Sequence, residues 1–243
     1  MPSKRKKQRQ FFYEREQSTV QTQTTNTQKF DIEPRNLSQA RLLRALEDDS
    51  NHIVFSLGSA GVGKTYIAAK FAAKQLLEKK VKKIIITRPT VEAGEKIGFL
   101  PGTLEEKMEP WLLPIYDAFM EDGGFTKEDI KSMITKGTIE IAPFNFLRGR
   151  SLKNCFIIAD EMQNSEQNQI KMLLTRLGDG SKIVVTGDLS QADRRTRVKS
   201  GLEDFLWRFE KNPVDGIELV KFNDSDIVRH PIIGEILKLY GEE

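Results

Sequence analysis

The sequence predicts an α/β fold in which a mostly parallel sheet is covered by helices on both faces. Two observations indicate this fold class. Short segments such as residues 155–159 and 182–186 are apolar throughout, which is typical of strands buried on both faces. Helical patterns separate these segments along the chain, and such alternation favours parallel strands joined by helical crossovers.

The predicted strands are short apolar runs between polar or turn-forming residues. Residues 52–57 (HIVFSL) form the first, and residues 83–87 (KIIIT) form the second. The remaining strands are expected at residues 138–142, 155–159, 182–186 and 217–222.

The predicted helices show apolar residues three or four positions apart. A leucine pattern over residues 42–46 indicates the first helix. Thr126 and Asp129 form a capping signal at the start of another. Trp111 and Trp207 also lie at helical spacing among apolar neighbours, and we expect both to pack there. The remaining helices are expected at residues 65–79, 126–137, 165–177 and 226–240.

Residues 1–32 differ in composition from the rest and are predicted to form a disordered tail. The first ten residues carry five cations and no acid, and residues 17–28 are almost entirely Gln, Thr, Ser and Asn. Such a segment cannot bury enough apolar surface to offset its chain entropy. The basic start is either a solvated tail or an electrostatic arm for nucleic acid. Residues 33–243 are predicted to form a single domain.

The composition excludes several classes of protein. The single cysteine, Cys155, excludes an internal disulfide and indicates a reducing compartment. With two histidines and one cysteine, the chain lacks the ligands of a structural zinc site. No apolar run approaches the roughly 20 residues of a membrane span. We therefore expect a cytoplasmic protein that does not associate with a membrane, and the net charge of +3 is too small to indicate nucleic acid by itself.

A phosphate-binding loop, or P-loop, follows the first predicted strand and precedes an amphipathic helix. It satisfies the pattern G-x-x-x-x-G-K-[ST] in the setting that this pattern requires. Glycines let backbone N–H groups point at an anion, and the helix adds the positive end of its dipole. Lys64 is expected to reach the β- and γ-phosphates, and Thr65 to ligate Mg²⁺. The predicted nucleotide-binding residues of the loop are Gly58, Ser59, Ala60, Gly61, Val62, Gly63, Lys64 and Thr65.

Two carboxylates follow the predicted strand at residues 155–159. Because ligands of open α/β folds sit at the carboxyl edge of the sheet, Asp160 and Glu161 are placed where a nucleotide binds. Asp160 is expected to hold Mg²⁺ through water, and Glu161 to polarise the attacking water.

The strand at residues 182–186 ends in Thr-Gly-Asp and is followed by Gln191. A polar side chain at the tip of a neighbouring strand can contact the γ-phosphate and report its loss. Gln191 is the candidate sensor, with Thr186 and Asp188 nearby. A strand-ending Gly-Asp turn is the structural alternative.

These motifs resemble a known family. The P-loop and the acid and sensor motifs are similar to the first RecA-like domain of superfamily 1 helicases. A longer motif, residues 88–102 (RPTVEAGEKIGFLPG), resembles the signature of the PhoH-like ATPases, the phosphate-starvation-inducible family. The resemblance extends from about residue 36 to residue 240. Its motifs are residues 58–65, 88–102, 148–150 (RGR), 160–164 (DEMQN), 186–191 (TGDLSQ) and 228–231 (VRHP).

The resemblance implies one RecA-like P-loop core with ATPase activity, often linked to RNA metabolism. Asn36-Leu37-x-Gln39 resembles an upstream glutamine motif, which implies that Gln39 contacts adenine and favours ATP over GTP. The alternative for Gln39 is a helix-surface residue. The sequence departs from the family at Met162, where alanine is usual, and at Arg194-Arg195, where Leu-Pro is more typical.

Hydrolysis in such folds normally uses an arginine at the γ-phosphate. A helicase supplies it from a second RecA-like domain, which a chain of this length does not hold. Either a late arginine acts within the same chain, or a neighbouring subunit supplies it. A shared site predicts a head-to-tail homo-oligomer, such as a hexameric ring. Arg229 is the preferred candidate because the resemblance covers it, and the others are Arg194, Arg195 and Arg197.

Single-stranded RNA or DNA is the expected partner beside ATP and Mg²⁺. Arg148 and Arg150, together with Phe144 and Phe146, are candidates for a stacking and phosphate-binding surface. The alternative is an aromatic strip in the core with charges beside it. We therefore expect an ATPase coupled to nucleic acid, with a nucleotide-dependent oligomeric binding switch as the alternative. A small-molecule P-loop kinase is less favoured, because no arginine-rich lid is evident.

Overall fold

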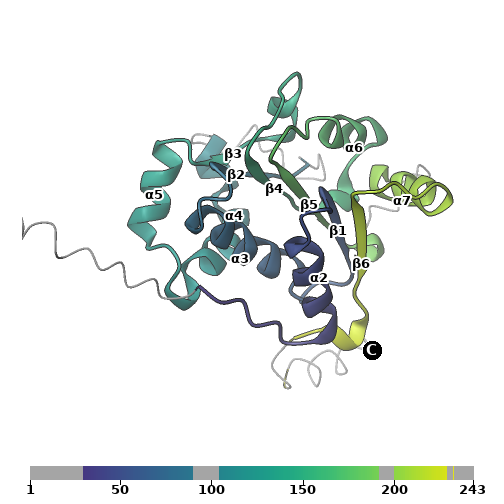
Figure 1. Ribbon diagram of the computed structural model, residues 1–243, viewed down its shortest axis with the longest axis horizontal. Helices are drawn as coiled ribbons and strands as arrows, with labels where there is room; N and C mark the ends of the chain where they lie inside the picture. The colour runs from purple at the N-terminus through teal and green to yellow at the C-terminus, as the bar shows by residue number, and fades with distance from the viewer. Residues whose placement is uncertain (1–29, 90–103, 192–199, 229–231, 233–243) are drawn as a thin grey trace, which may run out of the picture. The chain divides into compact units, whose positions relative to one another are not determined.

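The computed structural model describes residues 30–89, 104–191, 200–228 and 232. Its strands form one sheet in the order β3-β2-β4-β5-β1-β6, and each neighbouring pair is parallel (Figure 1). The strands are β1 (Ile53–Leu57), β2 (Lys83–Thr87), β3 (Ile139–Ile141), β4 (Cys155–Ala159), β5 (Lys182–Gly187) and β6 (Ile217–Lys221).

Helices connect most of these strands. The α-helices are α2 (Leu37–Glu47), α3 (Lys64–Leu77), α4 (Leu104–Met120), α5 (Lys127–Thr135), α6 (Gln167–Leu174) and α7 (Gly201–Lys211). Short 3₁₀ turns are η2 (Glu121–Gly123), η3 (Phe144–Leu147), η4 (Met162–Asn164), η5 (Leu189–Gln191) and η6 (Asp224–Asp226).

Helices cover both faces of the sheet. Neighbouring residues of a strand point to opposite faces. Phe156 of β4 contacts Phe71 of α3, with ring centroids 5.6 Å apart. Ile157, the next residue, belongs to a buried cluster that includes Ile170 of α6 and Leu202 of α7. Thus α3 packs on one face and α6 and α7 pack on the other, as Figure 1 shows, and the predicted α/β fold is confirmed.

Most predicted elements are observed within one to three residues of their expected ends. The capping signal at Thr126 and Asp129 forms a reciprocal capping box at the start of α5. Helix α4 was not among the predicted helices. It carries Pro110 and Pro114 in its interior, and proline usually ends or kinks a helix. Trp207 of α7 is 47% exposed, so it packs against its neighbours only in part.

The last predicted helix does not begin at Asp226. This residue ends η6, and Ile227 has an extended backbone (φ −63°, ψ 117°). The other residues of that prediction, apart from residue 228 and residue 232, lie outside the described part of the chain, as do residues 1–29 of the predicted tail. In the described part, no helix is both long enough and apolar enough to cross a membrane.

An ion-pair cluster near the β3 edge makes the stability depend on pH. Glu140 accepts hydrogen bonds from Arg150 at 2.5 Å and from Lys83 at 2.9 Å. The Arg150 bond above all lowers the pKa of Glu140 to about 2 from the ordinary 4.5. A lowered folded pKa stabilises the fold above the unfolded pKa, and this contribution is lost as the pH falls towards 2.

We therefore expect Glu140→Gln to lower the free energy of unfolding at neutral pH by about 1 kcal/mol, a modest value because the groups are partly exposed. The difference between wild type and variant should shrink as the pH falls from 4.5 towards 2. Urea denaturation at a series of pH values measures it. A difference that is the same at all pH values would contradict the ion-pair explanation.

Candidate functional site

The carboxyl ends of three adjacent strands meet at the P-loop. β5 lies between β1 and β4, and Leu57 is aligned with Gly187 while Val185 is aligned with Ala159. The P-loop follows β1, and the acid pair follows β4. The predicted loop, acid pair and sensor motif therefore lie at one edge of the sheet, as expected for a ligand site.

The loop glycines have backbones that other residues rarely adopt. Gly61 and Gly63 have φ values of 86° and 90°, in the left-handed region. A Cβ atom added to Gly63 would lie 2.5 Å from Gln39 Nε2. Both the dihedral angle and the close contact require glycine at position 63, immediately before α3 begins.

Lys64 lies among carboxylates at the mouth of the loop. Its Nζ donates to the carbonyl oxygens of Gly58 (2.6 Å) and Ser59 (2.8 Å). Desolvation lowers the pKa of Lys64, and the negative charges of Asp188, Glu161 and Asp160 oppose that effect. The ammonium thus sits where it can exchange loop carbonyls for phosphate oxygens.

Thr65 and Asp160 are in direct contact, although 95 residues separate them in the sequence. Thr65 Oγ1 donates to Asp160 Oδ1 at 2.7 Å, and Thr186 Oγ1 donates to the same oxygen at 2.5 Å. Asp160 is 8% exposed. A predicted pair of magnesium ligands therefore faces one point between α3 and β4.

The oxygen donors at this point suit Mg²⁺. This ion binds hydroxyl and carboxylate oxygens, usually only one or two from the protein, and completes its shell with water and substrate phosphates. Asp188 Oδ2 is buried and has no hydrogen-bond partner in the described part of the chain, so it offers a further acceptor for an ordered water. Within the described residues, no cluster of three or more His, Cys, Asp or Glu could hold a metal by itself. A Mg²⁺ site completed by water and substrate phosphates does not need such a cluster.

Glu161 is held by a residue to which sequence reasoning assigned no role. Its backbone is left-handed (φ 54°, ψ 39°), which is uncommon for a residue with a side chain. Gln163 Nε2 donates to Glu161 Oε2 at 2.5 Å, and Gln163 Oε1 accepts from the backbone of Asp188 at 3.0 Å. Gln163 is part of the DEMQN motif, but its partners depend on the fold.

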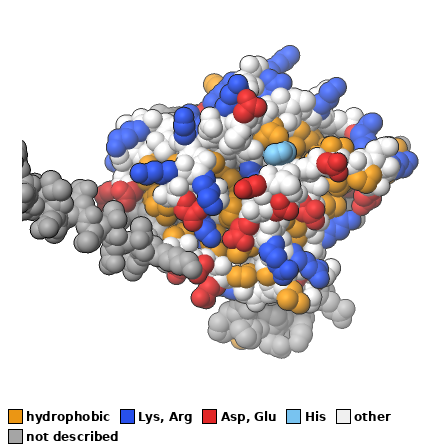
Figure 2. All heavy atoms as spheres, viewed as in Figure 1, with side chains coloured by type: hydrophobic (Ala, Val, Ile, Leu, Met, Phe, Trp, Pro, Cys, Tyr) orange, Lys and Arg blue, Asp and Glu red, His pale blue; other side chains and the backbone are white. Residues whose placement is uncertain are grey.

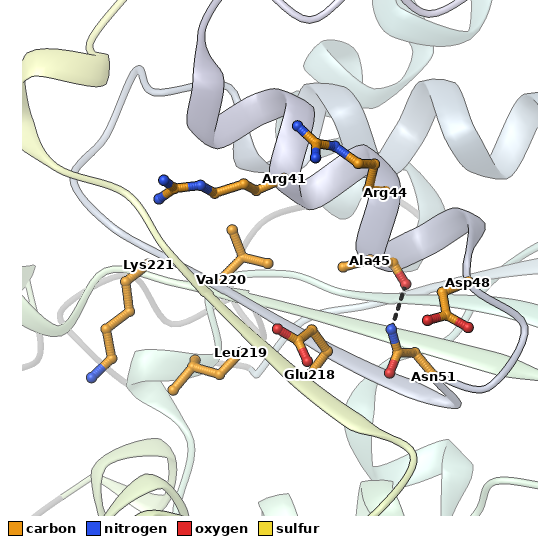
Figure 3. Close-up of a pocket in the computed structure, with 9 residues that line it drawn as sticks. All are labelled: Arg41, Arg44, Ala45, Asp48, Asn51, Glu218, Leu219, Val220 and Lys221. Carbon is orange, nitrogen blue, oxygen red and sulfur yellow. Dashed lines mark hydrogen bonds between the residues drawn. The ribbon is translucent and has the colours of Figure 1, made fainter.

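A cavity of about 350 Å³ opens beside the P-loop. It is lined by Arg35, Gln39, Ala60, Gly61, Gly63, Lys64, Thr65, Tyr66, Glu161 and Val228. A larger cavity of about 500 Å³ lies between α2 and β6, where Arg41, Arg44 and Lys221 surround an open groove (Figure 3). The larger cavity shares no residue with the motifs, so the smaller one is the candidate nucleotide site.

Gln39 lines this cavity, but its side chain is already bonded at both ends. Its Nε2 donates to the carbonyl of Val62 at 3.0 Å, and its Oε1 accepts from the backbone N–H of Arg35 at 2.8 Å. At 1% exposure it is not the helix-surface residue of the alternative interpretation. Gln39 therefore joins the start of α2 to the P-loop, and one amide hydrogen remains for a base.

Gln191 is not among the residues that line the cavity. It ends η5, its side chain is exposed, and its backbone N–H donates to the carbonyl of Asp188 at 3.1 Å. Thr186 and Asp188, which were expected only to lie nearby, are buried against the acid pair and its surroundings. The sensor role of Gln191 stays a prediction.

A strap formed by residues 222–228 lies against the P-loop, and the sequence did not indicate it. Val228 donates its backbone N–H to the carbonyl of Gly61 at 3.1 Å. Ser59 Oγ donates to Asp224 Oδ1 at 2.5 Å. Arg229 follows this strap in the sequence and lies outside the described residues. Arg194, Arg195 and Arg197 also lie outside them.

The candidate stacking surface is divided between core and solvent. Phe144 is 1% exposed and belongs to the core, whereas Phe146 is 66% exposed. Arg150 is paired with Glu140, and Arg148 is exposed. The expectation that all four residues share one open surface is therefore wrong, because η3 turns its two phenylalanines in different directions.

Known proteins resemble this chain over most of its length. Residues 31–241 match the PhoH-like protein family. A PhoH-like protein from Mycobacterium bovis is 46% identical over 210 residues, which cover 86% of this chain and 58% of the relative. A PhoH-like protein from Bacillus subtilis is 42% identical over 220 residues, covering 90% of this chain and 67% of the relative. The chain thus spans a little over half the length of the Mycobacterium bovis relative.

A solved structure with a similar fold is the large terminase of a thermophilic bacteriophage. Its TM-score is 0.53 at 13% identity, and the match covers 86% of this chain and 51% of the terminase. At this identity the likeness supports the fold alone. The family match over nearly the whole described domain is the stronger finding, and the chain belongs to the PhoH-like protein family.

Proposed function

We propose that this chain is a Mg²⁺-dependent ATPase. The observation that carries the proposal is the contact between Thr65 of the P-loop and Asp160 at the tip of β4, 2.7 Å apart. In P-loop enzymes, a hydroxyl and a carboxylate in these positions hold the metal that bridges the β- and γ-phosphates. Relatives and fold indicate a P-loop nucleoside triphosphatase in general; turnover itself is the proposal.

Each residue at the site has a distinct role in this proposal. Backbone N–H groups of residues 58–65 surround the phosphates, and Lys64 binds the β- and γ-phosphate oxygens. Bound Mg²⁺ would neutralise charge that develops on the phosphates. Thr65 and Asp160 orient the metal, directly or through water. Glu161 lines the same cavity and accepts a proton from the attacking water.

The base of the nucleotide is proposed to lie near Gln39 of α2 and Tyr66 of α3, which both line the cavity. Arg35 lies over the Tyr66 ring, 5.7 Å from its centroid. The remaining amide hydrogen of Gln39 can donate to an acceptor on the base, which supports the preference for ATP that the family resemblance implies.

Single-stranded RNA or DNA is the proposed partner of the ATPase. Exposed Phe146 and Arg148 of the η3 region lie next to α6, which carries exposed Lys171. Lys and Arg side chains lie along the upper edge of the face shown in Figure 2, and others lie over its middle and lower right among Asp and Glu. An exposed ring beside cations suits the stacking and phosphate contacts of a single strand. A cytoplasmic location follows from such a partner.

A nucleotide-dependent switch is the second candidate. The strap of residues 222–228 is bonded to the P-loop through Ser59 and Gly61, so phosphate binding in the loop can change its position. In this case ATP would alter an oligomer or an exposed surface with little turnover. The homo-oligomeric ring expected from the sequence is compatible with both the ATPase and the switch.

ATP turnover on size-fractionated protein tests the proposal. We expect phosphate release that requires Mg²⁺ and that increases several-fold when single-stranded RNA or DNA is added. Phe146→Ala should reduce this increase and leave the basal rate unchanged, because it removes only a stacking surface, worth about 1–3 kcal/mol per base. Val214→Ala, at another exposed apolar residue outside the motifs, is the control. Protein that binds ATP but releases no phosphate in any fraction would favour the switch.

A further inference from the structure

Gln163 joins the tips of β4 and β5 through both ends of its side-chain amide. Its Nε2 donates to the Glu161 carboxylate at 2.5 Å, and its Oε1 accepts from the backbone N–H of Asp188 at 3.0 Å. The side chain is 2% exposed, so water does not compete for these bonds. The buried Gln163 amide therefore connects the Glu161 carboxylate, which follows β4, to the backbone of Asp188, which follows β5.

The surroundings hold this amide in one place. Met162 is fully buried, and its carbonyl accepts a hydrogen bond from Ser165 Oγ at 2.6 Å. Gly187 leaves the space that the amide needs, because an added Cβ would lie 3.3 Å from Gln163 Oε1 and 2.6 Å from Leu202. The left-handed backbone at Glu161 then directs its side chain back towards Gln163. The arrangement is fixed by the backbone on both sides.

The β5 tip is also close to the phosphate-binding lysine. Asp188 lies near enough to Lys64 to raise the pKa of its ammonium against the larger effect of desolvation. One oxygen of Asp188 accepts two bonds from Ser190, and the other is buried with no hydrogen-bond partner among the residues that the structure describes. The β5 tip therefore adjoins both the phosphate-binding lysine and the Gln163 amide.

We infer that Gln163 is a positioning residue that orients the Glu161 carboxylate and ties its orientation to the β5 tip. The inference rests on the proposed ATPase function. A general base works only within hydrogen-bond reach of the water that it activates, and a displacement of about 1 Å costs on the order of 100-fold in rate. A glutamine that only packs between the strands would affect stability instead.

Two substitutions separate these roles. Gln163→Met keeps a similar volume and removes both hydrogen bonds. Gln163→Glu keeps an oxygen that can accept from the Asp188 N–H. It replaces the NH₂ group that donates to Glu161 by a second carboxylate oxygen. We expect either variant to lower kcat by roughly 10- to 100-fold, with the Kd for a fluorescent ATP analogue within about threefold of wild type. Gln167→Met, at an exposed glutamine four residues away, should change neither quantity.

A double-mutant cycle tests whether Gln163 acts through Glu161. In the Glu161→Gln background, Gln163→Met should lower turnover no further, because the group that it orients is gone. Independent, multiplicative losses would overturn the inference, as would wild-type kcat in Gln163→Met or a loss confined to nucleotide binding. If Gln163→Met does not fold, Gln163→Glu decides by the same criteria. Wild-type protein without turnover would instead refute the proposed ATPase.

Discussion

Replacing Lys64 by alanine is expected to lower ATP turnover at least about 100- to 1000-fold, the usual loss when one preorganised donor to developing charge is removed. The ammonium of Lys64 lies near the carboxylates of Asp160, Glu161 and Asp188 and is bonded to loop carbonyls. A phosphate chain that enters the loop without this cation would meet uncompensated negative charge. Phosphate release, measured with nucleotide well above its Kd, tests the prediction.

Two controls make this result specific. Lys74→Ala removes the same charge from the same helix, where Lys74 pairs with Glu47 at 3.5 Å, and it should leave turnover unchanged. Glu161→Gln should keep ATP binding and accumulate the bound state, because it removes the proposed base and leaves the loop intact. A Lys64→Ala protein that is folded and hydrolyses ATP at the wild-type rate would contradict the assignment of the site.

The position of the site was predictable because local patterns determine it. Parallel strands share a carboxyl edge, so motifs that follow strands at Leu57, Ala159 and Gly187 lie at one edge of the sheet. The P-loop pattern also fixes which residues carry the charge and the hydroxyl. These inferences need only strand identity and direction, which continuous apolar runs supply.

The partners of individual side chains were not predictable, because they depend on tertiary contacts. The Gln163 amide is bonded to the backbone of a residue 25 positions away. One amide hydrogen of Gln39 is bonded to Val62, which leaves only the other for a ligand. Asp188 is buried at the β5 tip, whereas Gln191 is exposed. Sequence spacing places such residues near a site, but it does not say which of their atoms remain available.

The strap of residues 222–228 bears on the source of the arginine expected at the γ-phosphate. Val228 lines the cavity and is bonded to Gly61, and it immediately precedes Arg229 in the sequence. We predict that the same chain supplies the arginine. Arg229→Ala is then expected to lower kcat by about 1000-fold or more, the range for an arginine that stabilises the transition state of phosphoryl transfer. Nucleotide binding should change little, and Arg208→Ala, an exposed arginine paired within α7, should have no effect.

Mixing two inactive variants distinguishes the sources of the arginine. Lys64→Ala retains Arg229, and Arg229→Ala retains an intact P-loop. If the arginine acts within its own chain, no subunit in the mixture has a complete site, and turnover stays at the level of the variants. If a neighbour supplies it, mixed oligomers contain some complete sites and turnover returns in proportion to their number. Because the strap joins the residue before Arg229 to the same P-loop, we expect no recovery; recovery would instead require a ring in which each site is shared by two subunits.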